Sequence, residues 1–281
     1  MISPLKNLIC IVFCIIGNIN AKTTASIERA LKNNLIKASV ICKGGLLLNY
    51  TIKNETQDSL KIIIPAGWRM NSVKEEYQDI LITRDQILAL GNHQKKIFEI
   101  KGYCCEADHS GPIEGALYEN GQMADTLLVK IAEYLNSHPN DSNTEQYAVW
   151  AISNNRPVSN IASYCDTCES PLRNFVSKLK GEPAKWYTLL KCVKINCYGN
   201  ISEYPLKLRG KINYSVNETC YAYFFILDRD GNKVGVIIGQ WLTPGNKDYL
   251  VNVNLKDFKK GKYKIMLADK KKEFFTKEFE I

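Results

Sequence analysis

The sequence lacks most of the signatures that mark an enzyme or a nucleotide-binding protein. It contains no GxSxG nucleophile elbow, no HExxH zinc motif, no phosphate-binding P-loop and no GxGxxG dinucleotide loop. It has only three histidines, and two of them, His93 and His138, lie in predicted loops. It also has no internal repeat and no low-complexity linker. We therefore predict that the protein is not a metabolic enzyme and holds no metal or other cofactor.

Long hydrophobic runs are also missing, with one exception near the N-terminus. Lys6 precedes the apolar stretch Leu8–Gly17, and Ala21 offers a small residue for cleavage, so residues 1–21 are predicted to be a secretory signal peptide. The stretch is shorter than the roughly 20 apolar residues that a membrane-spanning helix needs. We expect a mature chain without a transmembrane segment, secreted or held at the cell surface.

The excess of positive charge is small, with 37 Lys and Arg residues against 29 Asp and Glu residues. Its densest part, Lys256–Lys277, alternates lysines with apolar residues, which is typical of one solvated face of a sheet. Recognition of nucleic acid calls for a more concentrated basic surface. No nucleic-acid partner is therefore expected.

Cysteines are frequent: ten in all, two of them inside the predicted signal peptide. An even number in an exported chain favours disulfides. The disulfide candidates are Cys42, Cys165, Cys168, Cys192, Cys197 and Cys220. Two alternatives stay open: zinc bound by the pairs Cys165/Cys168 and Cys192/Cys197, or thiol redox chemistry at the first pair, which precedes a predicted helix.

The spacing of apolar residues predicts an α+β protein whose N-terminal part is a β-sandwich-like sheet with a helical half. A helix is expected over 24–35, and later helices over 125–136, 146–153 (capped at Ser142) and 171–180. Alternating strands are expected at 48–52, 60–64, 79–83, 87–90 and 96–103, with a hairpin around Gly91-Asn92.

From residue 206 onward the pattern is all strands. They are expected at 206–216, 219–228, 234–240, 249–255, 262–268 and 273–281, with a hairpin turn at Asp230-Gly231. So many short strands in this length predict an immunoglobulin-like β-sandwich. The predicted organisation is a signal peptide (1–21), an α+β domain (22–160), a Cys-containing helical linker (161–203) and the sandwich (204–281).

The most specific pattern joins a strand end to a helix start. Tyr103-Cys104-Cys105 ends a predicted strand, and Gln146-Tyr147-Ala148-Val149-Trp150 opens a predicted helix, with Trp150 on the face that carries Gln146. Over Tyr103–Trp150 the chain resembles the bacterial thioester-domain adhesins, which place an aromatic residue before the Cys and the Gln in a Gln-x-Ala-Ile-Trp-like helix start. The resemblance implies that Cys104 and Gln146 condense with loss of ammonia into a thioester that a host amine opens. Tyr103, Cys105 and Trp150 would support that site.

Two other functions remain open beside this one. In the first, Cys104 or Cys105 pairs with another cysteine such as Cys42, Gln146 and Trp150 only cap and pack the helix, and the protein is a non-covalent interaction module. In the second, His109 acts as base for a cysteine nucleophile in a hydrolase. We predict an exported binding protein whose partner is a protein or glycan at the cell surface.

Overall fold

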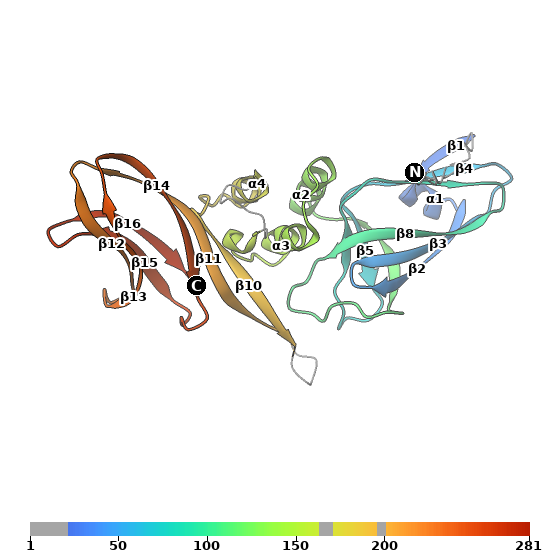
Figure 1. The fold of residues 1–281 in the computed structure, drawn as a ribbon. Coiled ribbons are helices and arrows are strands. Elements are labelled where there is room, and N and C mark those ends of the chain that lie inside the picture. The colour runs from blue at the N-terminus through green and yellow to red at the C-terminus, as the bar shows by residue number, and fades with distance from the viewer. Residues whose placement is uncertain (1–21, 163–170, 196–200) are drawn as a thin grey trace, which may run out of the picture.

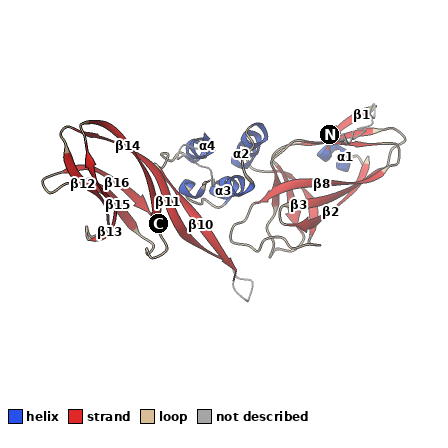
Figure 2. Ribbon diagram, viewed as in Figure 1, coloured by secondary structure: helices blue, strands red, loops and turns tan. Residues whose placement is uncertain are grey.

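A computed structural model describes residues 22–162, 171–195 and 201–281 of the chain. Along these residues come a β-barrel, a layer of helices and two further sheets, and the helices lie between the barrel and the C-terminal strands (Figure 1). Strands predominate in both outer parts (Figure 2). The predicted signal peptide lies outside the described residues. Within them, no helix has the length and apolar character needed to span a membrane.

The N-terminal strands close into a six-stranded barrel. In barrel order the strands are β2 (Ile36–Gly44), β3 (Leu47–Asn54), β8 (Lys95–Cys104), β6 (Ile80–Ile82), β5 (Trp68–Ser72) and β9 (Leu117–Met123). Period-two alternation buries Leu48, Tyr50 and Ile52 in the barrel core. The prediction of a sandwich-like sheet is therefore wrong, because these strands close into a barrel. The strand that closes it, β9, pairs with both β2 and β5, and its polar sequence shows no alternation that would have revealed it.

A smaller sheet adjoins the barrel and corrects two local predictions. It consists of β1 (Thr23–Ser26), β4 (Leu60–Ile64) and β7 (Gln86–Leu90). Because β1 pairs in parallel with β4, the predicted helix over 24–35 is shortened to α1 (Ile27–Lys32). The predicted hairpin at Gly91-Asn92 is also wrong, since β7 pairs with β4 while β8 pairs with β3 and β6.

The helical layer consists of α2 (Thr126–Ser137), α3 (Ser142–Ser153), the short 3-10 helix η1 (Val158–Asn160) and α4 (Pro171–Lys180). Apolar residues of these helices form a second core with Leu81 and Tyr103 of the barrel wall. The N-cap of α3 is Asp141 rather than the predicted Ser142, because the Asp141 carboxylate accepts from the backbone N–H of Thr144 at 2.9 Å.

The C-terminal strands form two antiparallel sheets around a third core. One sheet has the order β10 (Tyr187–Ile195), β11 (Ile201–Val216), β14 (Gly245–Asn254); the other has the order β13 (Lys233–Leu242), β12 (Cys220–Leu227), β15 (Lys262–Ala268), β16 (Glu273–Glu280). Leu208 and Ile212 from the first sheet share this core with Phe224 from the second. The segment predicted as a helical linker contains α4 but also β10, which pairs with β11 along its whole length.

Candidate functional site

The structure brings Cys104 and Gln146 into direct contact where the barrel meets the helices. The backbone N–H of Cys104 donates to Gln146 Oε1 at 3.0 Å, and Gln146 Nε2 donates to the Cys104 carbonyl at 2.8 Å. Both residues are buried, with exposed fractions of 5% and 8%. We refer to these two residues as the Cys104–Gln146 pair.

The topology explains why a side chain reaches this part of β8. On one edge, Cys104 lies opposite Ile80 of β6. On the other edge, the pairing of β8 with β3 ends at Lys101. The main chain of Cys104 therefore has no strand partner on that edge, and the Gln146 carboxamide supplies both the donor and the acceptor that a strand would have supplied. Gln146 stands in the right place because it lies in the first half of α3.

The two adjacent thiols point to different cores. Cys104 packs in the barrel core, which also contains Cys42, whereas Cys105 packs in the helical core. This alternation is normal for successive residues of a strand. Burial, followed by the nearby Glu106 carboxylate, raises the pKa of the Cys104 thiol to about 12, and the same two causes raise the pKa of Cys105. As free thiols, both are protonated at neutral pH.

A buried carboxylate lies next to Gln146 in the sequence. Glu145 is 1% exposed, forms an ion pair with Arg84 and accepts from the backbone N–H of Asn140 at 2.7 Å. Burial, followed by the hydrogen bond with Glu145, raises the pKa of the Tyr103 phenol. Tyr103 and Glu145 thus join the strand end to the start of α3, immediately beside the Cys104–Gln146 pair.

Trp150, one turn beyond Gln146 on α3, donates a hydrogen bond to Gln78, a residue that no sequence pattern selected. The indole Nε1 donates to Gln78 Oε1 at 3.2 Å, and Gln78 Nε2 donates to the carbonyl of His109 at 3.0 Å. The Tyr118 hydroxyl donates to the Gln78 carbonyl at 2.9 Å. Gln78 lies in a polar stretch without periodicity, so no pattern could have identified it as part of the site.

An ionic cluster fixes the chain just after the two cysteines. Glu106 accepts from the backbone N–H of Asp79 at 2.6 Å and forms an ion pair with Arg69. Arg69 also donates from Nε to Asp79 at 2.8 Å, and the backbone N–H of Cys105 donates to the Asp79 carbonyl at 2.9 Å. This cluster holds the end of β8 against β6 and limits movement of the cysteines.

His109 is not placed as the base of a cysteine nucleophile. It is exposed on the loop after β8, while both thiols are buried, and no hydrogen bond in the described part of the chain joins its ring to Cys104 or Cys105.

The remaining cysteine predictions are only partly within the described residues. Cys42, Cys104, Cys105 and Cys220 are free thiols. Cys42 belongs to the barrel core and Cys220 packs against the C-terminal core, so these two do not face each other. Residues Cys165, Cys168 and Cys197 lie outside the described residues, as does the side chain of Cys192. Among all the residues that the structure describes, there is no group of three or more His, Cys, Asp or Glu residues that could hold a metal ion.

Comparison with known protein families, curated proteins and solved structures finds no match to this chain.

Proposed function

We propose that this protein is an exported binding protein that attaches covalently to amines through a thioester between Cys104 and Gln146. The observation that carries the proposal is the reciprocal hydrogen bonding between the Gln146 carboxamide and the main chain of Cys104. It places the two reacting residues side by side in a buried site. A buried site favours a thioester because it keeps out the water that would hydrolyse it.

The chemistry of both steps balances without a cofactor. In formation, the Cys104 sulfur bonds to the Gln146 carboxamide carbon, the C–N bond breaks, and the nitrogen leaves as ammonia with the thiol proton. In opening, an amine nitrogen bonds to the same carbon, the C–S bond breaks, and a proton passes from the amine to the sulfur. The product is an amide on Gln146 and a free Cys104 thiol.

Formation requires a local rearrangement of the unreacted site. The Cys104 thiol packs in the barrel core, so it has to turn about χ1 towards the carboxamide. The Gln146 amide in turn has to release its two hydrogen bonds to the main chain. The proposal requires that these two side-chain changes suffice while β8 and α3 keep their positions.

Intact-mass measurement of the mature protein tests the proposal. We expect a mass lower by one ammonia in the wild type and in Cys105→Ala, but not in Cys104→Ala or Gln146→Glu. Cys105→Ala is the matched control because it removes the adjacent buried thiol. Methylamine treatment should then restore the thiol and add the amine to Gln146. A wild-type mass accounted for by disulfide hydrogens alone would contradict the thioester.

One observation favours a second function, a non-covalent interaction module. The Gln146 carboxamide already makes hydrogen bonds through both its oxygen and its nitrogen, which is how a buried structural glutamine is satisfied. In that case the pair only joins α3 to β8. The same mass measurement separates the two functions, because the module loses no ammonia.

The setting of this activity is also part of the proposal. We propose export through the predicted signal peptide, a location outside the cell or at its surface, and a protein or glycan partner. The two C-terminal sheets with their shared core support an immunoglobulin-like sandwich, which would act as a spacer or second contact surface. Cleavage after residue 21, read by N-terminal sequencing of secreted protein, tests the export step.

A further inference from the structure

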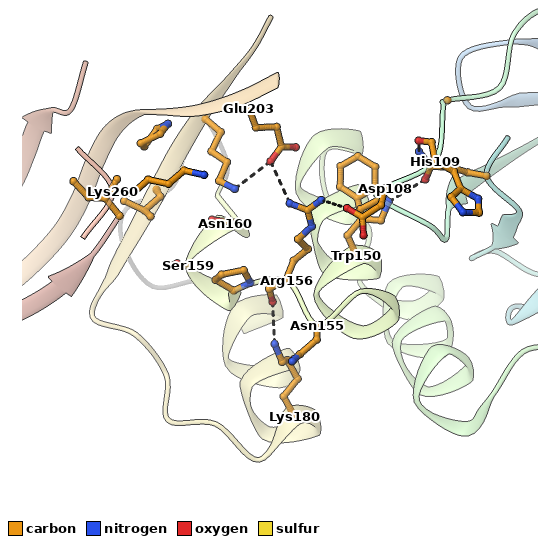
Figure 3. Close-up of a pocket in the computed structure, with 18 of the residues that line it drawn as sticks. Asp108, His109, Trp150, Asn155, Arg156, Ser159, Asn160, Lys180, Glu203 and Lys260 are labelled. Carbon is orange, nitrogen blue, oxygen red and sulfur yellow. Dashed lines mark hydrogen bonds and ion pairs between the residues drawn. The ribbon is translucent and has the colours of Figure 1, made fainter. Parts of the chain in front are cut away.

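A cleft of about 1370 Å³ lies between the helical layer and the C-terminal sheets. The loop after β8 and the end of α3 line one side, and residues of β10 and β11 line the other (Figure 3). Trp150 and Gln78 line this cleft, but Cys104 and Gln146 do not. The wall of the cleft therefore includes Trp150, which lies on the helix that carries Gln146, but not the Cys104–Gln146 pair itself.

Trp150 and Gln78 connect this wall to the segments that carry the pair. Trp150 follows Gln146 by four residues, about one helical turn, and shares its face. Gln78 precedes Ile80, the β6 residue opposite Cys104, by two positions. The hydrogen bond from Trp150 to Gln78 thus joins the helix that carries Gln146 to the chain that flanks Cys104. An amine in the cleft therefore meets the half-buried indole of Trp150, one turn away from Gln146 on the same helix.

Ionic groups cross the cleft in a connected row. Arg156 forms an ion pair with Asp108 at 2.8 Å and lies 3.9 Å from Glu203, which in turn pairs with Lys191 at 3.1 Å (Figure 3). Asp108 lies on the loop after β8, and its side chain is 79% exposed. It is the carboxylate best placed to receive a protonated amine beside Trp150, whose indole face also attracts cations.

Two lysines and one buried amide nitrogen in the cleft can bind anionic or carbonyl groups of a ligand. Lys185 and Lys260 line it and form no ion pair within the described ranges. Asn160 is 3% exposed, lines the cleft and has no hydrogen-bond partner for its side-chain nitrogen. An unsatisfied buried donor is costly, so a ligand oxygen at this point stabilises the complex. Glu76, Glu182 and Glu280 also line the cleft, so it carries both signs of charge. Lys185, Lys260 and Asn160 are its positions for ligand oxygen atoms.

We propose that this cleft docks the amine acceptor, and that the acceptor is a polypeptide segment with a lysine flanked by acidic residues. The proposal rests on the thioester function and adds its substrate class. The lysine side chain passes Asp108 and Trp150 towards Gln146, while the flanking carboxylates meet Lys185 and Lys260. The ammonium first gives up one proton to water. The neutral amine nitrogen then bonds to the Gln146 carbon as the C–S bond breaks, and its second proton passes to the Cys104 sulfur.

The test compares acceptors and charge variants of the full mature chain by intact mass. The acceptors are methylamine, a peptide with lysine flanked by glutamates, and the same peptide with serines in place of the glutamates. Lys185→Glu/Lys260→Glu replaces the two cleft lysines that form no ion pair within the described ranges, and both residues are exposed, so the fold should be kept. Lys32→Glu/Lys270→Glu makes the same change of net charge at exposed positions outside the cleft.

We expect the acidic peptide to react with the wild type on the order of fivefold faster than the neutral one, as two exposed ion pairs allow. The cleft variant should lose this preference, the remote variant should keep it, and methylamine should react equally with all three. Equal rates for the two peptides, or a preference that survives in the cleft variant, overturn the docking site alone. If no form loses ammonia, the thioester and its docking site are both overturned.

Discussion

The two ends of the molecule differ in where they keep their polar side chains. Among the described residues, eleven polar or charged residues are buried, and only Thr188 of these lies in the C-terminal sheets. The others lie in the barrel, the helices or the segments between them, and Glu145 and Gln146 are among them. Burial of a polar group costs free energy unless it is hydrogen-bonded. At the junction of barrel and helices, apolar packing alone therefore does not account for which residues are buried.

In the C-terminal sheets, aromatic side chains are exposed on the outer face instead. Tyr221, Tyr223 and Trp241 form a row on the outer face of β12 and β13, with ring centroids 5.2 and 5.4 Å apart, and Trp241 is 71% exposed. Inside, the core is apolar and regular. Substitutions should therefore act by loss of packing in one region and by loss of hydrogen bonds in the other.

The largest expected effect is in the C-terminal core. Phe224 is fully buried and stacks on Tyr249 with centroids 4.3 Å apart, so Phe224→Ala should lower the free energy of unfolding by about 3–5 kcal/mol. Tyr223→Ala, on the outer face of the same strand, should cost about 1 kcal/mol. Urea unfolding measures both. Equal costs for the two variants would show that the third core is not the main source of stability there.

The next effect is at the junction. Gln146→Ala leaves the N–H and carbonyl of Cys104 without partners in a buried site, and should cost about 2–4 kcal/mol. Asn252→Ala, on an exposed position of β14, is the control and should change the free energy of unfolding by less than about 0.5 kcal/mol. If Gln146→Ala is as mild as the control, the contrast between the two regions is lost.

Alkaline pH should act on the junction through its thiols. The folded-state pKa of Cys104 is about 12, above its ordinary value of 9.0. Between these two pH values the native state keeps the thiol proton, whereas the unfolded state loses it. Stability is therefore complete below about pH 9 and falls as the pH rises towards 12, by up to about 1.4 kcal/mol per pH unit for this group.

The measurement is the pH dependence of unfolding in protein with a free Cys104 thiol, prepared with methylamine if the mass shows a thioester. Cys104→Ser should lower the alkaline slope by the contribution of this thiol, while that of Cys105 remains, and Cys220→Ser, at a partly exposed thiol, should change it less. An unchanged slope in Cys104→Ser would mean that this thiol is not shielded from water.

The smallest effect concerns the start of α3. Asp141→Ala removes the side chain that caps the helix and should cost about 1 kcal/mol, while Ser142→Ala should cost much less. Thermal unfolding of both variants measures the difference. The reverse order would restore Ser142 as the cap and would move the start of the helix that carries Gln146.

Regular alternation let the sequence alone predict much of the C-terminal part. Along β12, the residues Ala222, Phe224 and Ile226 are buried while their neighbours are not, and this period fixes a strand without knowledge of its partners. Helices α2 and α4 were predicted for the same reason, from apolar residues at helical spacing. Cys104 and Gln146 were selected from a short sequence resemblance, supported by their positions at the end of a predicted strand and the start of a predicted helix.

Only the tertiary structure decided what those local patterns build. Closure of the barrel depends on pairing between β9 and strands far away in the sequence, and β9 carries too few apolar residues to be recognised by itself. The contact of Cys104 with Gln146 arises because β3 ends its pairing early and α3 fills the vacant edge of β8. Gln78 joins the site for the same reason, since its role lies in a hydrogen bond across 72 positions of the chain. Periodicity records which way a side chain faces, whereas the identity of the neighbour it meets is set by packing between distant segments.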